Sequence, residues 1–321
     1  MTLPLSRKDM SRISVPGRVA VSVPGVEVVA VHSGIGCVDP RSAQGPQALA
    51  DAGLSHGLVE LGLAPVWSDV SKAVRPVATD ESLRLLGLRH TLRKVMEASE
   101  AAVRKGRRLL VVGGDQTQAL GAWSGVAKAT CHAGPIGLIW IDAHPDARTD
   151  GPLPVTHLSR MVLAHLLGRG QSDLQVGEGG PVFDPAHVCV LGVRDGEAGE
   201  YDVLSELGVR VISKSETARL GLGAALREAQ TIATAGTCGF VVSLDLDVID
   251  PTEAPGVNLP VPFGLSGREL ESALHGIGRK RDFLGIEISE FNPPRDAQNQ
   301  TCTLVRRLVR AAFSPDTSVA G

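Results

Sequence analysis

The fold is decided by the stretch Ile139-Trp140-Ile141-Asp142-Ala143-His144-Pro145-Asp146. An apolar run ends here in three potential metal ligands, Asp142, His144 and Asp146, which stand at alternate positions. In a β-strand and its extended continuation, alternate residues point to the same side. We therefore expect the three side chains to converge at the end of a buried strand.

A second stretch, Val241-Val242-Ser243-Leu244-Asp245-Leu246-Asp247, repeats this design. Together the two stretches offer four carboxylates and an imidazole, which suit a divalent ion such as Mn²⁺. Shared carboxylates can hold two such ions roughly 3.5–4 Å apart and orient a hydroxide for hydrolysis. A lone Asp after a strand is more commonly a helix N-cap, and an Asp-x-Asp pair can instead hold magnesium or lie in a solvated loop. Neither alternative explains two clusters that each continue a buried strand.

Eight short apolar runs have the character of strands, and segments with helical or loop character separate most of them. The runs cover residues 26–32, 64–70, 108–112, 137–143, 188–193, 209–213, 240–247 and 283–289. Helices are expected over 45–52, over the amphipathic segment 80–105 and from Thr117 onward. Buried strands that alternate with helices predict a mostly parallel sheet covered on both faces. Ligand chemistry gathers at the carboxyl ends of such strands, which is where the acidic residues of this chain stand.

Composition narrows the class of protein further. The chain has 321 residues, of which 43% are hydrophobic, and a net charge of -3, so it shows no electrostatic footprint for nucleic acid. No apolar run reaches the length of a membrane span, residues 1–16 do not resemble a signal peptide, and the five scattered cysteines suit reduced thiols. We expect a cytoplasmic protein without nucleic-acid or membrane partners. No linker divides the chain, so we predict one domain over 23–315, an arm over 1–22 and a tail over 316–321.

Three motifs, taken in order, resemble those of the arginase/agmatinase (ureohydrolase) family. They are Gly113-Gly114-Asp115-Gln116, Asp142-Ala143-His144-Pro145-Asp146 and Ser243-Leu244-Asp245-Leu246-Asp247-Val248-Ile249-Asp250-Pro251. The family signatures are GGDH, DAHxD and SxDxDxxDP, and the resemblance runs from about Val26 to the C-terminal helix. It implies a three-layer α/β/α sandwich with an eight-stranded parallel sheet. It also implies two bridged manganese ions, hydrolysis of a guanidinium carbon with release of urea, and a homo-oligomer such as a trimer or hexamer.

The resemblance also implies a ligand for each position of the centre. Asp142 and Asp245 would each bridge both ions, whereas His144 and Asp247 would complete one site. The other site would be completed by Asp146 and Gln116. Gln116 departs from the family, because it stands where the family has histidine, and its neutral amide oxygen is a weaker donor than imidazole. We expect two Mn²⁺ per subunit with the site beside Gln116 weak or empty, unless Gln116 only hydrogen-bonds a metal-bound water.

On the substrate side, Arg194-Asp195-Gly196-Glu197-Ala198-Gly199-Glu200 is similar to the arginase pattern RDxDxGE. By this resemblance Glu197 would contact the α-amino end of the substrate, and Glu200 would support the pocket. The alternative is a solvated acidic turn. Glu290 would bind the guanidinium group in a bidentate manner.

Three further positions are less specific. His157 lies where family members carry an acid–base histidine, although a surface histidine fits equally well. Arg148 is similar to the arginine of formimidoylglutamase-type relatives, whose substrates carry carboxylates, or else it is a salt-bridge partner. Asn258-Leu259 replaces the small Gly-Thr usual in the family, which indicates an altered pocket.

The preferred interpretation is a manganese-dependent hydrolase of a guanidino or amidino compound, with arginine as the first substrate to consider. A metal-bridging hydroxide would attack the amidine carbon, Asp146 would relay a proton, and urea or an amide product would leave. The first alternative is a catalytically impaired member of the family that serves as a binding or assembly subunit. A metal-dependent deacetylase is disfavoured by the two bridging carboxylates, and phosphoryl transfer by the absence of a P-loop.

Overall fold

The computed structural model describes residues 25–71, 80–170, 174, 176 and 180–315. The predicted arm over 1–22 and the predicted tail over 316–321 therefore lie outside the described residues. Among the described residues, no helix is long and apolar enough to cross a membrane.

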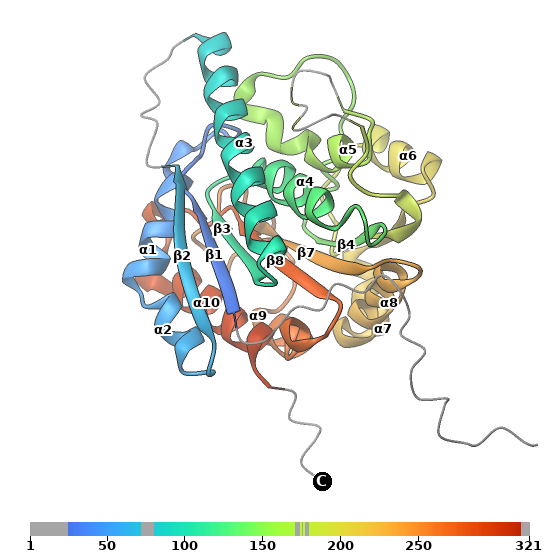
Figure 1. The fold of residues 1–321 in the computed structure, drawn as a ribbon. Helices are drawn as coiled ribbons and strands as arrows, with labels where there is room; N and C mark the ends of the chain where they lie inside the picture. Colours follow the sequence, from blue (N-terminus) through green and yellow to red (C-terminus); the bar gives the residue numbers. More distant parts are fainter. Residues whose placement is uncertain (1–24, 72–79, 171–173, 175, 177–179, 316–321) are drawn as a thin grey trace, which may run out of the picture.

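Eight strands form one sheet in the order β2-β1-β3-β8-β7-β4-β5-β6. Figure 1 shows the part of this order that runs from β2 to β4. Their bounds are Gly25–Val31 (β1), Ala64–Ser71 (β2), Arg108–Gly113 (β3), Ile136–Ile141 (β4), Val188–Leu191 (β5), Arg210–Ile212 (β6), Gly239–Asp245 (β7) and Phe283–Ser289 (β8). Every pair of neighbouring strands is parallel. The predicted eight-stranded parallel sheet is confirmed, and each predicted strand agrees with the structure to within two residues at either end.

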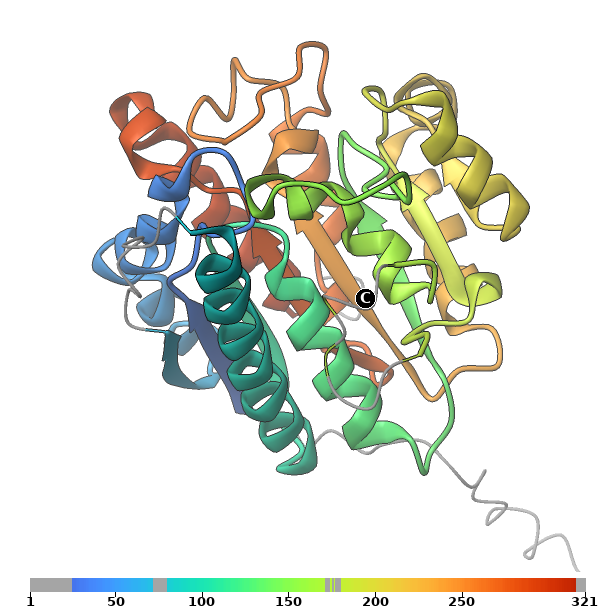
Figure 2. The ribbon, with the colours of Figure 1, turned by 90° about the horizontal axis from the view of Figure 1, so that it is seen from above.

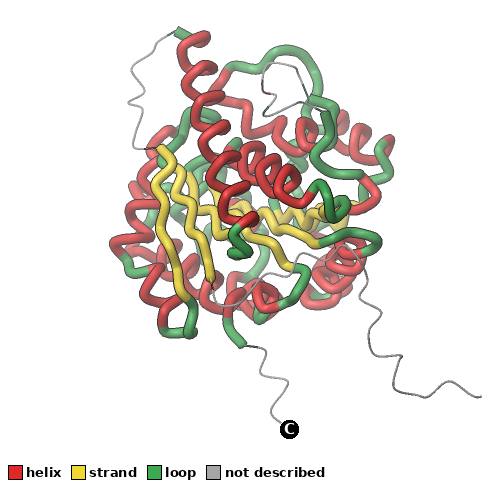
Figure 3. The backbone as a smooth tube through the Cα atoms, viewed as in Figure 1, coloured by secondary structure: helices red, strands yellow, loops and turns green. Residues whose placement is uncertain are grey.

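Helices cover both faces of this sheet and complete the predicted three-layer α/β/α sandwich (Figures 2 and 3). Their bounds are Gly45–Asp51 (α1), Leu54–Val59 (α2), Glu81–Arg104 (α3), Gln118–Thr130 (α4), Val162–Leu166 (α5), Ala198–Glu206 (α6), Lys214–Leu220 (α7), Leu222–Thr234 (α8), Gly267–Leu274 (α9) and Gln300–Phe313 (α10). The long helix expected over 80–105 is α3, and Asp80 caps it by accepting the N–H groups of Ser82 and Leu83.

Two apolar cores separate the three layers. On one face, α3 and α4 pack on the sheet through side chains such as Leu92 and Trp123. On the other face, α1, α2, α8, α9 and α10 bury residues such as Leu49 and Val305. Six strands, β1, β3, β4, β5, β7 and β8, are buried along almost their whole length, which explains their continuous apolar sequences, whereas the edge strands β2 and β6 are partly exposed.

The strand order determines which residues can meet. Strands β7 and β8 lie between β3 and β4, although they come much later in the sequence. The chain therefore crosses over two strand positions between β3 and β4, and the carboxyl ends of β3, β8, β7 and β4 stand side by side. Gly114 allows the end of β3 to pack closely against the loop after β1, because a Cβ atom there would lie 1.8 Å from the Ser33 carbonyl oxygen.

Candidate metal centre

The three motifs end their strands with the same local structure. The Oδ1 atom of Asp142 accepts the N–H of His144 at 2.8 Å, and the Oδ1 atom of Asp245 accepts the N–H of Asp247 at 2.7 Å. After β3, Oδ1 of Asp115 likewise accepts the N–H of residue 117 at 2.9 Å. A side chain that captures the N–H two residues later stops the strand and turns the chain. This turn explains why the strands predicted to reach 143 and 247 end at Ile141 and at Asp245.

These turns, rather than an extended strand, bring the candidate ligands together. The residues after Ile141 do not continue as an extended strand, and Asp146 has a φ of 49°, in the left-handed region. Side-chain alternation therefore does not place His144 and Asp146, and the expectation of an extended continuation was wrong. What brings them beside Asp142 is a turn that the Asp142 carboxylate itself stabilises.

The candidate ligands are almost completely withdrawn from solvent. The exposed fractions are 0% for Asp142, 5% for Asp146, 3% for Asp245 and 1% for Asp247. Burial raises the pKa of Asp146, Asp245 and Asp247 well above the usual range of a carboxyl group, and the nearby negative charges raise it further. A divalent cation would offset this repulsion.

The donors suit a divalent cation in chemistry, although they do not form a closed cage. The Oδ2 atom of Asp142 is buried without a hydrogen-bond partner, as expected of an oxygen reserved for another ligand. No three His, Cys, Asp or Glu side chains within the described residues converge tightly enough to make a preformed cation site. To bind a divalent cation such as Mn²⁺, the carboxylate and imidazole donors would therefore have to move closer together.

A hydrogen bond within the protein keeps the amide oxygen of Gln116 from acting as a metal ligand. Its Oε1 atom accepts a hydrogen bond from the Ser289 hydroxyl, and its Nε2 atom is buried without a partner. Its backbone N–H donates to the Oε1 atom of Glu290 at 2.8 Å. The amide oxygen that was expected to ligate an ion is thus already engaged by Ser289.

His144 and Asp247 have more supporting contacts. The Nδ1 atom of His144 lies 3.4 Å from Oδ1 of Asp142, and its Nε2 atom lies 3.6 Å from Oδ2 of Asp195. Asp247 accepts the N–H of Leu259 at 3.3 Å. Arg194 donates to the Asp247 carbonyl oxygen at 2.9 Å and to three other carbonyl oxygens, so it fixes this turn against the following loop.

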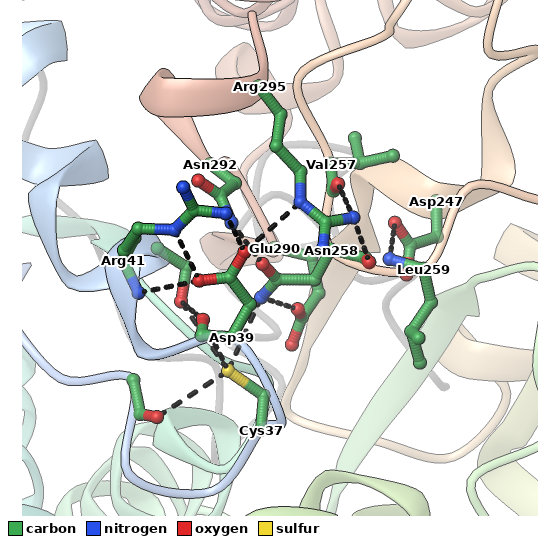
Figure 4. Close-up of polar contacts among 12 residues, drawn as sticks. Cys37, Asp39, Arg41, Asp247, Val257, Asn258, Leu259, Glu290, Asn292 and Arg295 are labelled. Atoms are coloured by element: carbon green, nitrogen blue, oxygen red, sulfur yellow. Dashed lines mark hydrogen bonds and ion pairs between the residues drawn. The ribbon is translucent and has the colours of Figure 1, made fainter.

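Glu290 is buried beside the carboxylates, and two protein donors contact its side chain. It has a φ of 66°, follows β8 directly and is 3% exposed. Its Oε2 atom accepts a hydrogen bond from the amide of Asn258 (Figure 4), and its Oε1 atom accepts the backbone N–H of Gln116. Burial raises its pKa to about 8, and the charge of Asp115 contributes. A bound planar cation would stabilise the charged form of this group.

Asn258 joins three loops around Glu290, as Figure 4 shows. Its amide also donates to the Cys37 sulfur at 3.3 Å, and its Oδ1 atom accepts from Asn292 at 2.7 Å. Arg295 donates to its carbonyl oxygen at 2.8 Å and to the Asp39 carboxylate at 3.1 Å. The sequence predicted that this position alters the pocket, but not that it contacts Glu290.

The remaining predicted residues lie on two segments. The segment between β4 and α5 carries Arg148 and His157, and the N-terminus of α6 carries Glu197 and Glu200. Glu200 is 3% exposed, and its carboxylate accepts the N–H groups of Ala147 at 3.2 Å and of Glu197 at 3.0 Å. The Glu197 carboxylate is paired with Arg148 at 3.1 Å. His157 is half-buried, and its Nδ1 atom lies 3.1 Å from the Thr156 hydroxyl. Glu200 thus supports the loop that carries Asp146, and its role in a substrate pocket stays a prediction.

Sequence reasoning gave no site role to a polar cluster beneath the centre. Glu287, fully buried on β8, accepts a hydrogen bond from Gln118 at 2.7 Å, and burial raises its pKa to about 8. The Ser243 and Ser289 hydroxyls lie beside its carboxyl group and partly offset this rise. The signal was available, because a glutamate stands in the middle of the apolar run of β8.

The fold and the acidic centre together define an α/β protein of the ureohydrolase type. The model of the arginase family matches residues 25–314 of this chain. The arginase of Bacillus caldovelox is 33% identical over 298 residues, which cover 90% of this chain and 97% of the relative. This chain belongs to the arginase family.

Solved structures agree with this assignment. The structure of the Bacillus caldovelox arginase superposes with a TM-score of 0.83 at 32% identity, covering 91% of this chain and 99% of that one. The Bacillus cereus arginase superposes with a TM-score of 0.82 at 30% identity and with the same coverage. The relatives named here are hydrolases, and membership places this chain among amidinohydrolases at the level of the family.

Proposed function

We propose that this protein is a manganese-dependent hydrolase of a small guanidino or amidino compound. The observation that carries the proposal is the set of buried carboxylates at the ends of β4 and β7, where burial and the neighbouring negative charges raise the pKa of Asp146, Asp245 and Asp247. Asp142 and Asp245 would hold two ions in common, and His144, Asp247 and Asp146 would complete their ligands. Once bound, the cation supplies Lewis acidity and lowers the pKa of water.

The chain's own residues then bind and orient the substrate. The Glu290 carboxylate lies beside the ligand candidates and can accept hydrogen bonds from a planar cation while Gln116 and Asn258 hold it in place. Asp146, which lies within the ligand set, would relay a proton to the leaving amine. His157 would exchange this proton with solvent.

The test is urea release from a panel of guanidino compounds, arginine first, with metal-stripped protein before and after addition of Mn²⁺. We expect turnover that depends on Mn²⁺ and is lost in Asp245→Asn. If that variant retains turnover, the assignment of the reaction to this centre is wrong.

A second candidate function is that of a binding or assembly subunit without hydrolysis. Two observations favour it: the Gln116 amide oxygen is engaged by Ser289, and both oxygens of Glu290 accept protein donors. Bound Mn²⁺ without urea release across the whole panel would support this function over the first.

The proposal also covers the oligomeric state of the protein and its cellular compartment. We propose a cytoplasmic homo-oligomer, a trimer or hexamer, that takes a small molecule and neither nucleic acid nor membrane. Sedimentation velocity of the purified chain tests the assembly, since a monomer at micromolar concentration would contradict it.

A further inference from the structure

Arg148 makes an ion-paired cluster at the rim of the candidate centre, two residues after Asp146. Its Nε and Nη2 atoms donate to the two oxygens of the Asp150 carboxylate at 3.1 and 2.9 Å. Its Nη1 atom donates to Oε1 of Glu197 at 3.1 Å. The guanidinium group therefore joins two carboxylates, one from its own loop and one from the start of α6.

The backbone on both sides holds this arrangement in place. The buried Glu200 carboxylate accepts the N–H of Ala147 with one oxygen and the N–H of Glu197 with the other. The residues immediately before Arg148 and at Glu197 are thus tied to the same side chain. The backbone N–H of Arg148 also donates to the Arg160 carbonyl oxygen at 3.2 Å. Because both chain segments are anchored, the ion pair is not an accident of two flexible side chains.

The three charged groups differ in their contact with solvent. The Arg148 side chain is only 18% exposed, whereas the side chains of Glu197 and Asp150 are 53% and 69% exposed. A guanidinium group that is mostly shielded and has two anionic partners keeps its charge. It therefore acts as a fixed counter-ion to the Glu197 carboxylate.

We propose that Arg148 is a specificity-determining residue that withdraws Glu197 from binding a cation. This inference rests on the proposed function, because it concerns the far end of a guanidino substrate whose near end lies at Glu290. A free Glu197 would attract an ammonium group, whereas a paired Glu197 offers it little. The preferred substrates are therefore guanidino compounds that carry no ammonium group at the far end.

The test is equilibrium binding, measured by isothermal titration calorimetry on the Mn²⁺-loaded protein, so that it does not depend on turnover. Two ligands of similar length are compared: butylguanidine, with an uncharged end, and agmatine, with an ammonium end. We expect the wild type to bind agmatine no more tightly than butylguanidine. Agmatine bound tenfold more tightly than butylguanidine, or no binding of either ligand, would overturn the inference.

Variants then identify the residue responsible. Arg148→Ala should raise the affinity for agmatine about tenfold relative to butylguanidine, because Glu197 then accepts a charge-assisted hydrogen bond from the ligand. Adding Glu197→Gln to that variant should abolish the gain. Asp150→Asn is the matched control, since it removes the other partner of Arg148 and should leave the affinity ratio as in the wild type. An unchanged ratio in Arg148→Ala would contradict the role of Arg148.

The two proposals can fail separately. If no guanidino compound releases urea while the affinity ratio and its response to Arg148→Ala are as expected, the hydrolytic function is wrong and the specificity assignment stands. If urea is released fastest from arginine or agmatine, with the affinities to match, the hydrolytic function stands and the specificity assignment is wrong.

Discussion

The two halves of the candidate centre are built from the same carboxylates but differ in their supporting contacts. On the His144–Asp247 half, Leu259 and Arg194 contact Asp247, and Asp142 and Asp195 flank His144. On the other half, Asp146 has a left-handed backbone, and the oxygen of Gln116 is bonded to Ser289. The difference teaches that protein contacts hold the side chains of one half, whereas in the other half the Gln116 oxygen would have to leave Ser289 to ligate an ion.

The largest effect is expected where the two halves meet. Asp142 is predicted to serve both ions, so Asp142→Asn should abolish tight Mn²⁺ binding in both halves and lower activity by at least about 10³-fold. The amide retains an oxygen for the N–H of His144, so the turn survives. Metal content after dialysis and urea release measure the two losses.

The matched control for Asp142→Asn lies in an exposed turn of the third motif. Asp250 accepts the N–H of Thr252 at 3.0 Å in the same kind of turn, outside the buried cluster. Asp250→Asn should therefore retain Mn²⁺ binding. If one ion remains tightly bound in Asp142→Asn, the halves do not share this carboxylate.

An effect of intermediate size is expected from a substitution that restores the family histidine at position 116. In the wild type we expect one tightly bound Mn²⁺ per chain and a second that dialysis removes. Gln116→His should tighten the second ion about 10- to 100-fold, because imidazole is a stronger ligand than an amide oxygen engaged by Ser289. Elemental analysis and the spin coupling of paired Mn²⁺ ions in electron paramagnetic resonance measure the occupancy.

The control for this repair is Gln116→Ala, which should bind as many tight ions as the wild type. Two equally tight ions in the wild type would show that the halves are equivalent and that Gln116 is a competent ligand.

The smallest effect is on stability without metal, and its sign follows from the raised pKa values. Glu290, with its pKa of about 8, binds more protons in the folded than in the unfolded chain between about pH 4.5 and pH 8, and the raised pKa values of Asp146, Asp245 and Asp247 act in the same direction. Stability is therefore full at the acidic end of this window and is lost as the pH rises through it. The Tm of metal-free protein should be a few degrees lower at pH 8.5 than at pH 6.

The pH dependence of the Tm should also differ between variants in the two halves of the centre. Asp146 faces three carboxylates (Asp142, Glu200 and Glu290) and the positive charge of Arg160. Asp247 faces only two, Glu290 and Asp142, and it has both the positive charge of Arg194 and the N–H of Leu259. Asp146→Asn should therefore reduce the pH dependence of the Tm more than Asp247→Asn. The opposite order, measured by calorimetry with a chelator present, would mean that the half with more contacts is the more strained one.

Much of the fold could be predicted from the sequence, because a buried parallel strand has a simple signature. Continuous apolar runs gave all eight strands, and the Asp80–Lys105 segment showed the helical period of α3. The order of the strands could not be obtained in this way. Placing β8 and β7 between β3 and β4 depends on long-range packing, which leaves no local pattern.

The sequence could predict which residues belong to the candidate site, but not which side chains those residues contact. The motifs identified Asp142, Asp245 and Gln116, since their residue types mark them. Side-chain partners depend on the three-dimensional neighbours, so the bond from Ser289 to Gln116 and the bond from Asn258 to Glu290 were not foreseen. Pairing of Arg148 was among the alternatives for that residue, and only the fold shows Glu197 to be a partner.

The position of β8 also has a consequence for how the protein comes to its final state. This strand is the last to emerge during synthesis, yet it takes a place in the middle of the sheet, beside β3 and β7. Contacts between segments so far apart in sequence form slowly, because a long loop must close first. Until β8 (Phe283–Ser289) is inserted, no strand connects β3 to the pair formed by β7 and β4. A nascent chain therefore completes its sheet and brings Gln116 and Glu290 beside the carboxylates of β4 and β7 in the same late step.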